Sequence, residues 1–111
     1  MAIFSTHLLN SIDGTHASDV EIIIYKSKND NKVVFLEDKT DSSGRMLKEF
    51  ELTKEDCESD YEMVINSGNY FNNSSDIINE IIVKFKMKHS EKKYHIPLII
   101  SPNGYSIWWS K

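Results

Sequence analysis

Short runs of β-branched and aromatic residues recur along this chain, and clusters of Asn, Asp, Ser and Gly separate them. This pattern is typical of an all-β sandwich and not of alternating helices and strands. Since the chain has 111 residues, we expect one domain that spans residues 1–111. The eight expected strands cover approximately residues 3–9, 20–26, 32–40, 46–48, 61–67, 80–87, 94–101 and 105–109.

Turn-forming residues mark the ends of several expected strands. Residues 27–31 are typical of a hairpin loop, and residues 41–44 of a turn in which Gly44 takes a positive φ. The Pro-Asn-Gly sequence at 102–104 favours a tight turn, which would make the flanking strands antiparallel neighbours.

One short helix is expected among the strands, at residues 54–59. Thr53 is a suitable N-cap, and Glu55 and Asp56 place negative charge in the first turn, where the helix dipole favours it. The polar stretch 69–79 is expected to be a loop that a few apolar side chains tie to the body.

The composition argues against nucleic-acid and membrane partners. The net charge is -4, whereas nucleic-acid binding depends on clustered Lys and Arg, and no apolar run approaches the roughly 20 residues that span a bilayer. The N-terminal sequence lacks the basic and apolar regions of a secretion signal, so we expect a cytoplasmic location. The single cysteine, Cys57, has acidic neighbours that disfavour a thiolate, so it is not expected to be a nucleophile.

Histidines are the main candidates for chemistry, because the chain has no common metal-ligand spacing, phosphate loop or nucleophile elbow. His16 and His89 lie in polar, turn-like stretches and are expected to be exposed without a special role. His7 and His95 lie inside expected strands, where an imidazole must find a partner or line a polar cavity. The pattern alone leaves both a structural and a catalytic role open for them.

Four segments in order along the chain resemble the transthyretin family. Residues 5–10 (STHLLN) and 14–20 (GTHASDV) are similar to its opening strand and its Gly-x-Pro-Ala turn, with His16 in place of the proline. Residues 40–45 (TDSSGR) and 68–71 (GNYF) match two internal motifs. Residues 94–106 (YHIPLIISPNGYS) are similar almost throughout to the closing signature YHVPLLLSPxGYS.

The resemblance implies a transthyretin-like (prealbumin-like) eight-stranded Greek-key β-sandwich with one short helix, and it points to the 5-hydroxyisourate hydrolase branch. His7, Arg45 and His95 stand at the three polar positions that the hydrolases keep, where hormone carriers have Lys, Glu and Thr. The implied reaction converts 5-hydroxyisourate to 2-oxo-4-hydroxy-4-carboxy-5-ureidoimidazoline in urate degradation, without a cofactor and without a bound metal.

The implied chemistry is attack of water on a ring carbonyl, which needs a base, an oxyanion stabiliser and a proton donor. We expect His7 to be the base or to orient the water, Arg45 to clamp the purine-derived substrate and stabilise the oxyanion, and His95 to be a second proton-transfer or orienting group. The sequence leaves open which histidine does which task. Activity should fall at acid pH with an apparent pKa of about 6 to 7. The resemblance also implies a homotetramer, a dimer of dimers, with the sites in a channel between subunits.

The C-terminus departs from the family pattern, because residues 108–111 (WWSK) replace Tyr-Arg-Gly-Ser. By register, Trp108 and Lys111 take the places of the tyrosine and the terminal serine that face the site, and we expect both to contact substrate. This change keeps open a non-catalytic, small-molecule binding protein. A second alternative is a metal-binding protein that holds Zn²⁺ with His7 and His95 across a subunit interface, which activity that survives chelation would exclude.

Overall fold

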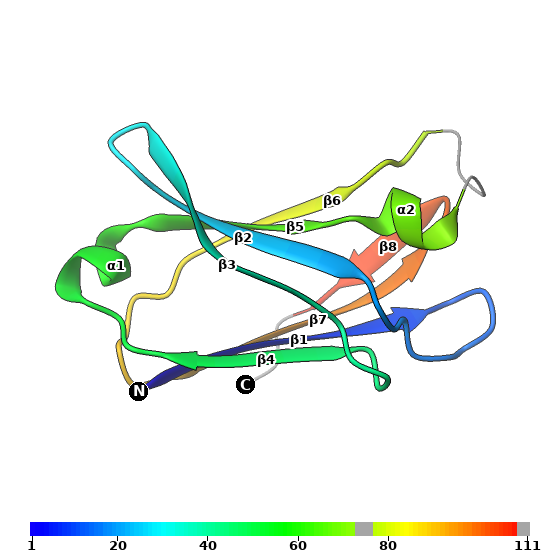
Figure 1. The fold of residues 1–111 in the computed structure, drawn as a ribbon, viewed down its shortest axis with the longest axis horizontal. Helices are drawn as coiled ribbons and strands as arrows, with labels where there is room; N and C mark the ends of the chain where they lie inside the picture. The colour runs from blue at the N-terminus through cyan, green and yellow to red at the C-terminus, as the bar shows by residue number, and fades with distance from the viewer. Residues whose placement is uncertain (73–76, 109–111) are drawn as a thin grey trace.

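Two four-stranded sheets pack face to face in the computed structural model, which describes residues 1–72 and 77–108 (Figure 1). One sheet has the order β4 (Arg45–Phe50), β1 (Ala2–Asn10), β7 (Lys93–Ser101), β8 (Gly104–Ile107). The other has the order β3 (Asn31–Lys39), β2 (Glu21–Lys28), β5 (Asp60–Ile65), β6 (Ile81–Phe85). The expected sandwich and its eight strands are thus confirmed, with strand ends that differ by a few residues.

Strand β1 lies inside its sheet and organises it. It pairs antiparallel with β4 and parallel with β7, whereas the other strand pairs are antiparallel. Buried and half-buried residues alternate along β1, as expected for a strand with one face on the core. The odd-numbered residues of β1 therefore point away from the second sheet.

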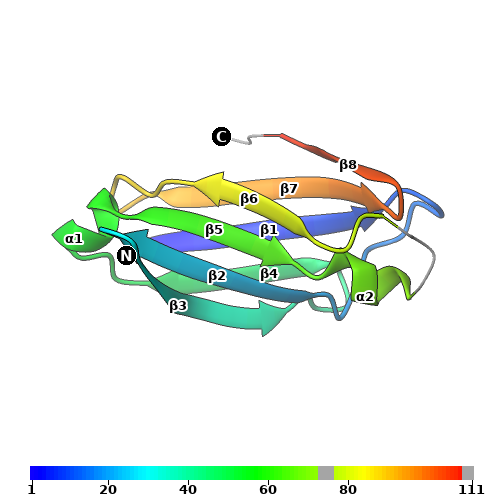
Figure 2. The same ribbon diagram turned by 90° about the horizontal axis from the view of Figure 1, so that it is seen from above.

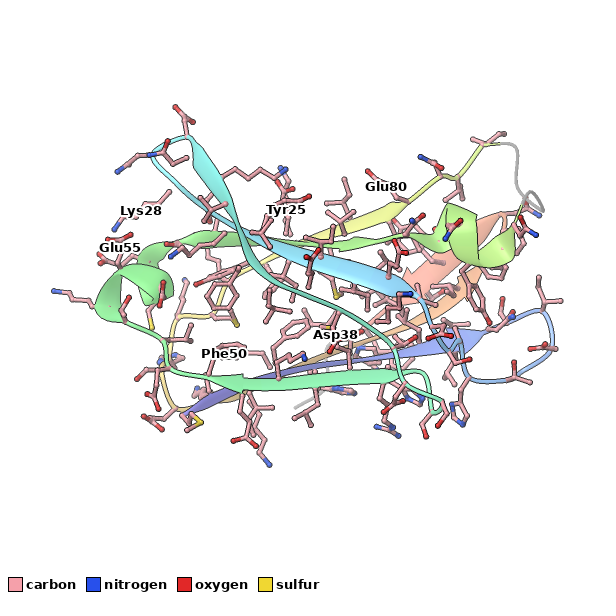
Figure 3. The ribbon with its side chains drawn as sticks, in the orientation of Figure 1. Tyr25, Lys28, Asp38, Phe50, Glu55 and Glu80 are labelled. Carbon is pink, nitrogen blue, oxygen red and sulfur yellow. The ribbon has the colours of Figure 1, made fainter. Side chains whose placement is uncertain are left out.

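Aromatic rings fill much of the space between the sheets. Phe4 from β1 stacks on Phe85 from β6, with ring centroids 5.2 Å apart. Phe50 points from β4 toward the interior, where its ring meets Phe35 edge to face (Figure 3). Since large apolar groups meet across the gap from both sheets, burial of these rings holds the two layers together.

Helix α1 (Lys54–Glu58) confirms the expected helix and its N-cap. The Thr53 side chain accepts a hydrogen bond from the Asp56 backbone N–H, and the Asp56 carboxylate accepts one from the Thr53 N–H. This reciprocal pair is a capping box, which satisfies two backbone donors that a helix leaves free.

A second helix, α2 (Ser67–Phe71), corrects the expectation of a single helix and of a strand that reaches residue 67. The side chain of Asn66 accepts the backbone N–H of Asn69 and caps the helix start. Asn72 ends it in the left-handed conformation, at φ 46°. The two helices lie at opposite ends of the sandwich (Figures 1 and 2).

The first hairpin is tighter than the five-residue loop that the sequence suggested. Strand β2 continues to Lys28 and β3 starts at Asn31, so only Asn29 and Asp30 form the turn. Both have positive φ, 51° and 69°, which Asn and Asp tolerate better than most residues. The expected 101–104 hairpin is confirmed by the antiparallel pairing of Ser101 with Gly104.

The helices in the described part of the chain are too short to cross a membrane.

Candidate active site

His7 and Arg45 lie side by side on the outer face of one sheet. His7 belongs to the half-buried, odd-numbered set of β1, and Arg45, the first residue of β4, is its direct cross-strand partner. Directly opposed residues of antiparallel strands project from the same face, so an imidazole and an exposed guanidinium meet there.

His95 reaches the same face from β7, on the other side of β1. Ser5, two residues before His7, pairs with His95 in the parallel register, and its hydroxyl lies 2.8 Å from Nδ1 of His95. This hydrogen bond fixes the orientation of the half-buried imidazole. The fold therefore brings together the three residues that the sequence singled out: His7, Arg45 and His95.

A fourth residue, His16, contacts this group from the loop that follows β1. Its Nδ1 lies 3.0 Å from Nε2 of His7, and the two rings stack with centroids 5.1 Å apart. His16 is exposed, as the sequence suggested, but it has a partner. Its position in a turn hid this contact, and the one available signal was that it replaces the family's proline.

The turn before β4 closes over this loop without a side chain at Gly44. Gly44 has φ +73°, as expected, and a Cβ there would lie 2.5 Å from the carbonyl oxygen of Leu8 and 3.2 Å from Cβ of His16. Any other residue would force these segments apart. The glycine thus allows the β3–β4 turn to pack against both β1 and the His16 loop.

The surroundings of His7 favour its neutral form. Burial lowers the pKa of His7 below its ordinary value of 6.5, and the neighbouring Arg45 and His16 side chains act in the same direction. A hydrogen bond with the Ser43 backbone opposes them, but the net pKa stays low. A neutral imidazole beside a permanent cation can accept a proton from water while the guanidinium holds an anion.

Asp41 shapes the turn that presents Arg45. Its carboxylate accepts hydrogen bonds from the backbone N–H groups of Arg45, at 3.0 Å, and Ser43, at 2.8 Å. These bonds, and the charges of Arg45 and His7, lower the pKa of Asp41 below its usual range. Asp41 is therefore ionised at neutral pH and adds a negative charge near the site.

The chain was compared with known families and structures. The model of the HIUase/Transthyretin family matches residues 4–109. This chain belongs to the HIUase/Transthyretin family. The 5-hydroxyisourate hydrolase of Salmonella dublin is 30% identical over 108 residues, which are 96% of this chain and 79% of that protein.

Two solved structures of the HIUase/Transthyretin family share the fold. The 5-hydroxyisourate hydrolase of Klebsiella pneumoniae has a TM-score of 0.76 and 22% identity, with 100% of each chain covered. Transthyretin from Sparus aurata has a TM-score of 0.80 and 20% identity, over 96% of this chain and 95% of that chain. Because a 5-hydroxyisourate hydrolase and a transthyretin both match with similar TM-scores, the fold alone does not assign the function.

Trp108 lies at the end of β8, at the open edge of this HIUase/Transthyretin fold. Its backbone N–H donates to the carbonyl of Pro97 at 3.4 Å, and the residue is 44% exposed. It lines a cavity of about 410 Å³, and its contact with substrate stays a prediction. Lys111, the other expected contact, lies outside the described residues. The cavity is lined by Val83, Lys84, Phe85, Lys86, Tyr94, Ile96, Ile107 and Trp108.

In the described part of this HIUase/Transthyretin family member, no group of three or more His, Cys, Asp or Glu side chains is placed so that it could hold a metal ion. The site is instead made of two hydrogen-bonded histidines, a third histidine held by Ser5, and Arg45. Ser5 was not singled out from the sequence, although its position two residues before His7 places it on the same face of β1.

Proposed function

We propose that this chain hydrolyses 5-hydroxyisourate to 2-oxo-4-hydroxy-4-carboxy-5-ureidoimidazoline, with His7, Arg45 and His95 as its catalytic group. The observation that carries the proposal is their convergence on one outer sheet face from β1, β4 and β7. Curated relatives that align with almost the whole chain are 5-hydroxyisourate hydrolases, which supports the same activity for this chain.

The division of labour follows from the surroundings of each group. His7, whose pKa is lowered by burial and by neighbouring positive charge, is neutral at pH 7 and takes the proton of the attacking water. Arg45 keeps its charge, and its planar fork of donors holds the acidic ring and the developing oxyanion.

His95 donates the proton that the leaving ring nitrogen needs. Ser5 holds Nδ1 of His95, and no hydrogen bond between Nε2 of His95 and another described residue occurs, so that nitrogen can face the substrate. The proton removed from water and the proton given to nitrogen balance over the turnover, so the reaction needs no cofactor.

Assembly would complete the site, because one subunit holds these residues on an open face. Apolar residues of the edge strands β6 and β8 are partly exposed, as at Ile82 and Ile107, and unpaired edges with apolar side chains favour association. A homotetramer built as a dimer of dimers is therefore part of the proposal. We also propose a cytoplasmic location, as expected from the sequence.

The deciding experiment follows the decay of freshly generated 5-hydroxyisourate with and without the protein, in the presence of a chelator. We expect the protein to accelerate decay well above the uncatalysed background. Saturable binding without acceleration would instead identify a small-molecule binding protein. Activity lost on chelation and restored by Zn²⁺ would identify metal-dependent chemistry.

A further inference from the structure

His16 gives the site a histidine that the family's turn motif does not supply. The motif has a proline at this position, which has neither a ring nitrogen nor a charge, whereas Nδ1 of His16 lies within hydrogen-bond distance of Nε2 of His7. The contact involves the very imidazole to which we assign the base role.

We propose that His16 is a positioning residue for His7: it accepts the Nε2–H of His7, so that the lone pair of the neutral His7 ring stays on Nδ1, and stacking holds the ring in place. This inference rests on the proposed hydrolase function. It is analogous to the third member of a catalytic triad, which orients the base and does not touch the substrate.

The backbone around His16 is built to keep this contact. His16 forms an antiparallel bridge with Leu9, and the residues on either side of it hydrogen-bond back to β1: Ala17 N–H to Leu8, at 2.9 Å, and Asn10 N–H to Thr15, at 2.8 Å. An otherwise exposed imidazole is thus fixed against β1, beside the close approach of Gly44.

The direction of the hydrogen bond follows from what each ring must do. One of the two facing nitrogens has to carry a proton, and a ring that serves as base needs its lone pair on the other nitrogen. The exposed ring of His16 can carry its own proton on Nε2, toward solvent. When His7 becomes protonated, a hydrogen bond with the Ser43 backbone stabilises the charged ring.

His16 also affects His7 through its charge when it is protonated. Four groups surround His7: Arg45 from β4, His95 from β7, His16 from the loop, and the carboxylate of Asp41 from the turn before β4. A protonated His16 would repel a proton on His7, so the pair resists double protonation. An uncharged acceptor at position 16 would keep the hydrogen bond and remove this repulsion.

Two variants separate these effects. His16→Phe keeps a stacking ring but has no nitrogen, so kcat should fall about tenfold while KM stays within about twofold, since only the orientation of the base is lost. His16→Asn places an amide oxygen near the position of Nδ1, so it should keep at least about half of the wild-type kcat. Its acid limb should move to higher pH, because the repulsion is gone.

An NMR readout tests the contact independently of turnover. In ¹⁵N spectra at pH 8, the His7 ring of the wild type and of His16→Asn should carry its proton on Nε2, whereas His16→Phe should show a mixture of tautomers. His89→Phe, at an exposed histidine in another loop, is the matched control and should change neither rate nor spectrum.

The possible outcomes separate the proposed hydrolase function from the positioning role of His16. A wild type without hydrolase activity would overturn the proposed function, and the His7 tautomer would still show whether His16 positions that ring. An active wild type whose rate and His7 tautomer are unchanged in His16→Phe would overturn the role of His16 and leave the hydrolase intact. If His16→Phe does not fold, failure of His16→Asn to retain the rate and the Nε2–H tautomer overturns it as well.

Discussion

At the scale of single residues, removal of any one of His7, Arg45 and His95 should disable the hydrolysis. We expect each alanine variant to lower kcat/KM roughly a hundredfold or more, because each loses a base, an oxyanion partner or a proton donor. Initial rates of 5-hydroxyisourate decay measure this. His89→Ala should match the wild type, and wild-type rates in all three variants would refute the site.

The pH profile should reflect the neutral His7. A base works above its own pKa, and the pKa of His7 is lowered from 6.5 by burial first and then by Arg45 and His16. Activity should therefore be complete at pH 7, and the acid limb of kcat/KM should lie below 6.5, at the low side of the interval expected from sequence. A profile that does not change between pH 4 and 8 would exclude a histidine base.

Trp108 belongs to the altered C-terminus, and its expected contact with substrate can be tested by substitution. If its ring forms part of the substrate channel, Trp108→Ala should raise KM several-fold by removal of an aromatic wall, with a smaller change in kcat. Steady-state kinetics decide this, with Trp108→Tyr, the family's residue, as the conservative control. Equal KM values for all three proteins would show that Trp108 serves the cavity at the β8 edge and not the substrate.

The three polar residues of the site were predictable because motif resemblance placed each of them inside or next to a strand. Their convergence depended on pairing: His7 meets Arg45 through the β1–β4 register, which strand periodicity alone does not specify. The contact of His16 with His7 could not be predicted from the sequence, because a side chain in a turn has no periodicity that indicates its partner.

At the scale of elements, an ion pair anchors α1 to the body. Lys26 from β2 meets Asp56 from α1 at 2.9 Å, with side chains 23% and 12% exposed. Burial alone would raise the pKa of Asp56, but hydrogen bonds from Lys26 and Thr53 lower it overall. Asp56 therefore stabilises the fold as a carboxylate, and this contribution is lost as pH falls through its folded-state pKa, below 3.8.

Substitution of Asp56 tests this anchor. Asp56→Ala removes both the ion pair and the capping box, and should cost roughly 2 kcal/mol of the free energy of unfolding at pH 7. Urea unfolding measures the change. Glu58→Ala, which breaks only the exposed 4.0 Å pair with Lys28, is the matched control and should change stability little. Equal losses in the two variants would contradict the anchor.

Strand and helix predictions differed in quality for a physical reason. Alternating apolar residues fixed the strands, and Thr53 with the acidic first turn fixed α1. Helix α2 was not predicted because it is one short turn whose start and stop depend on Asn66 and Asn72, and Asn is also a frequent residue of turns and loops.

At the scale of the whole molecule, the particle should be a tetramer of about four times 12.9 kDa. Light scattering coupled to gel filtration measures the mass. Ile107→Glu, at an exposed apolar residue on the edge strand β8, should reduce the mass, whereas Asn29→Glu, at an exposed polar residue in the β2–β3 turn, should not. A stable, fully active monomer would remove the shared channel.

The parallel pairing of β1 with β7 has a consequence for how the protein is made. Ser5 and His95 are hydrogen-bonded neighbours although 90 positions separate them in the chain. During synthesis from the N-terminus, His7 and Arg45 leave the ribosome long before His95, and closing such distant contacts is slow. The proposed catalytic group is therefore completed among the last steps of folding. A truncated translation product that ends before β7 keeps His7 and Arg45 but lacks His95, on a sheet without β7 and β8.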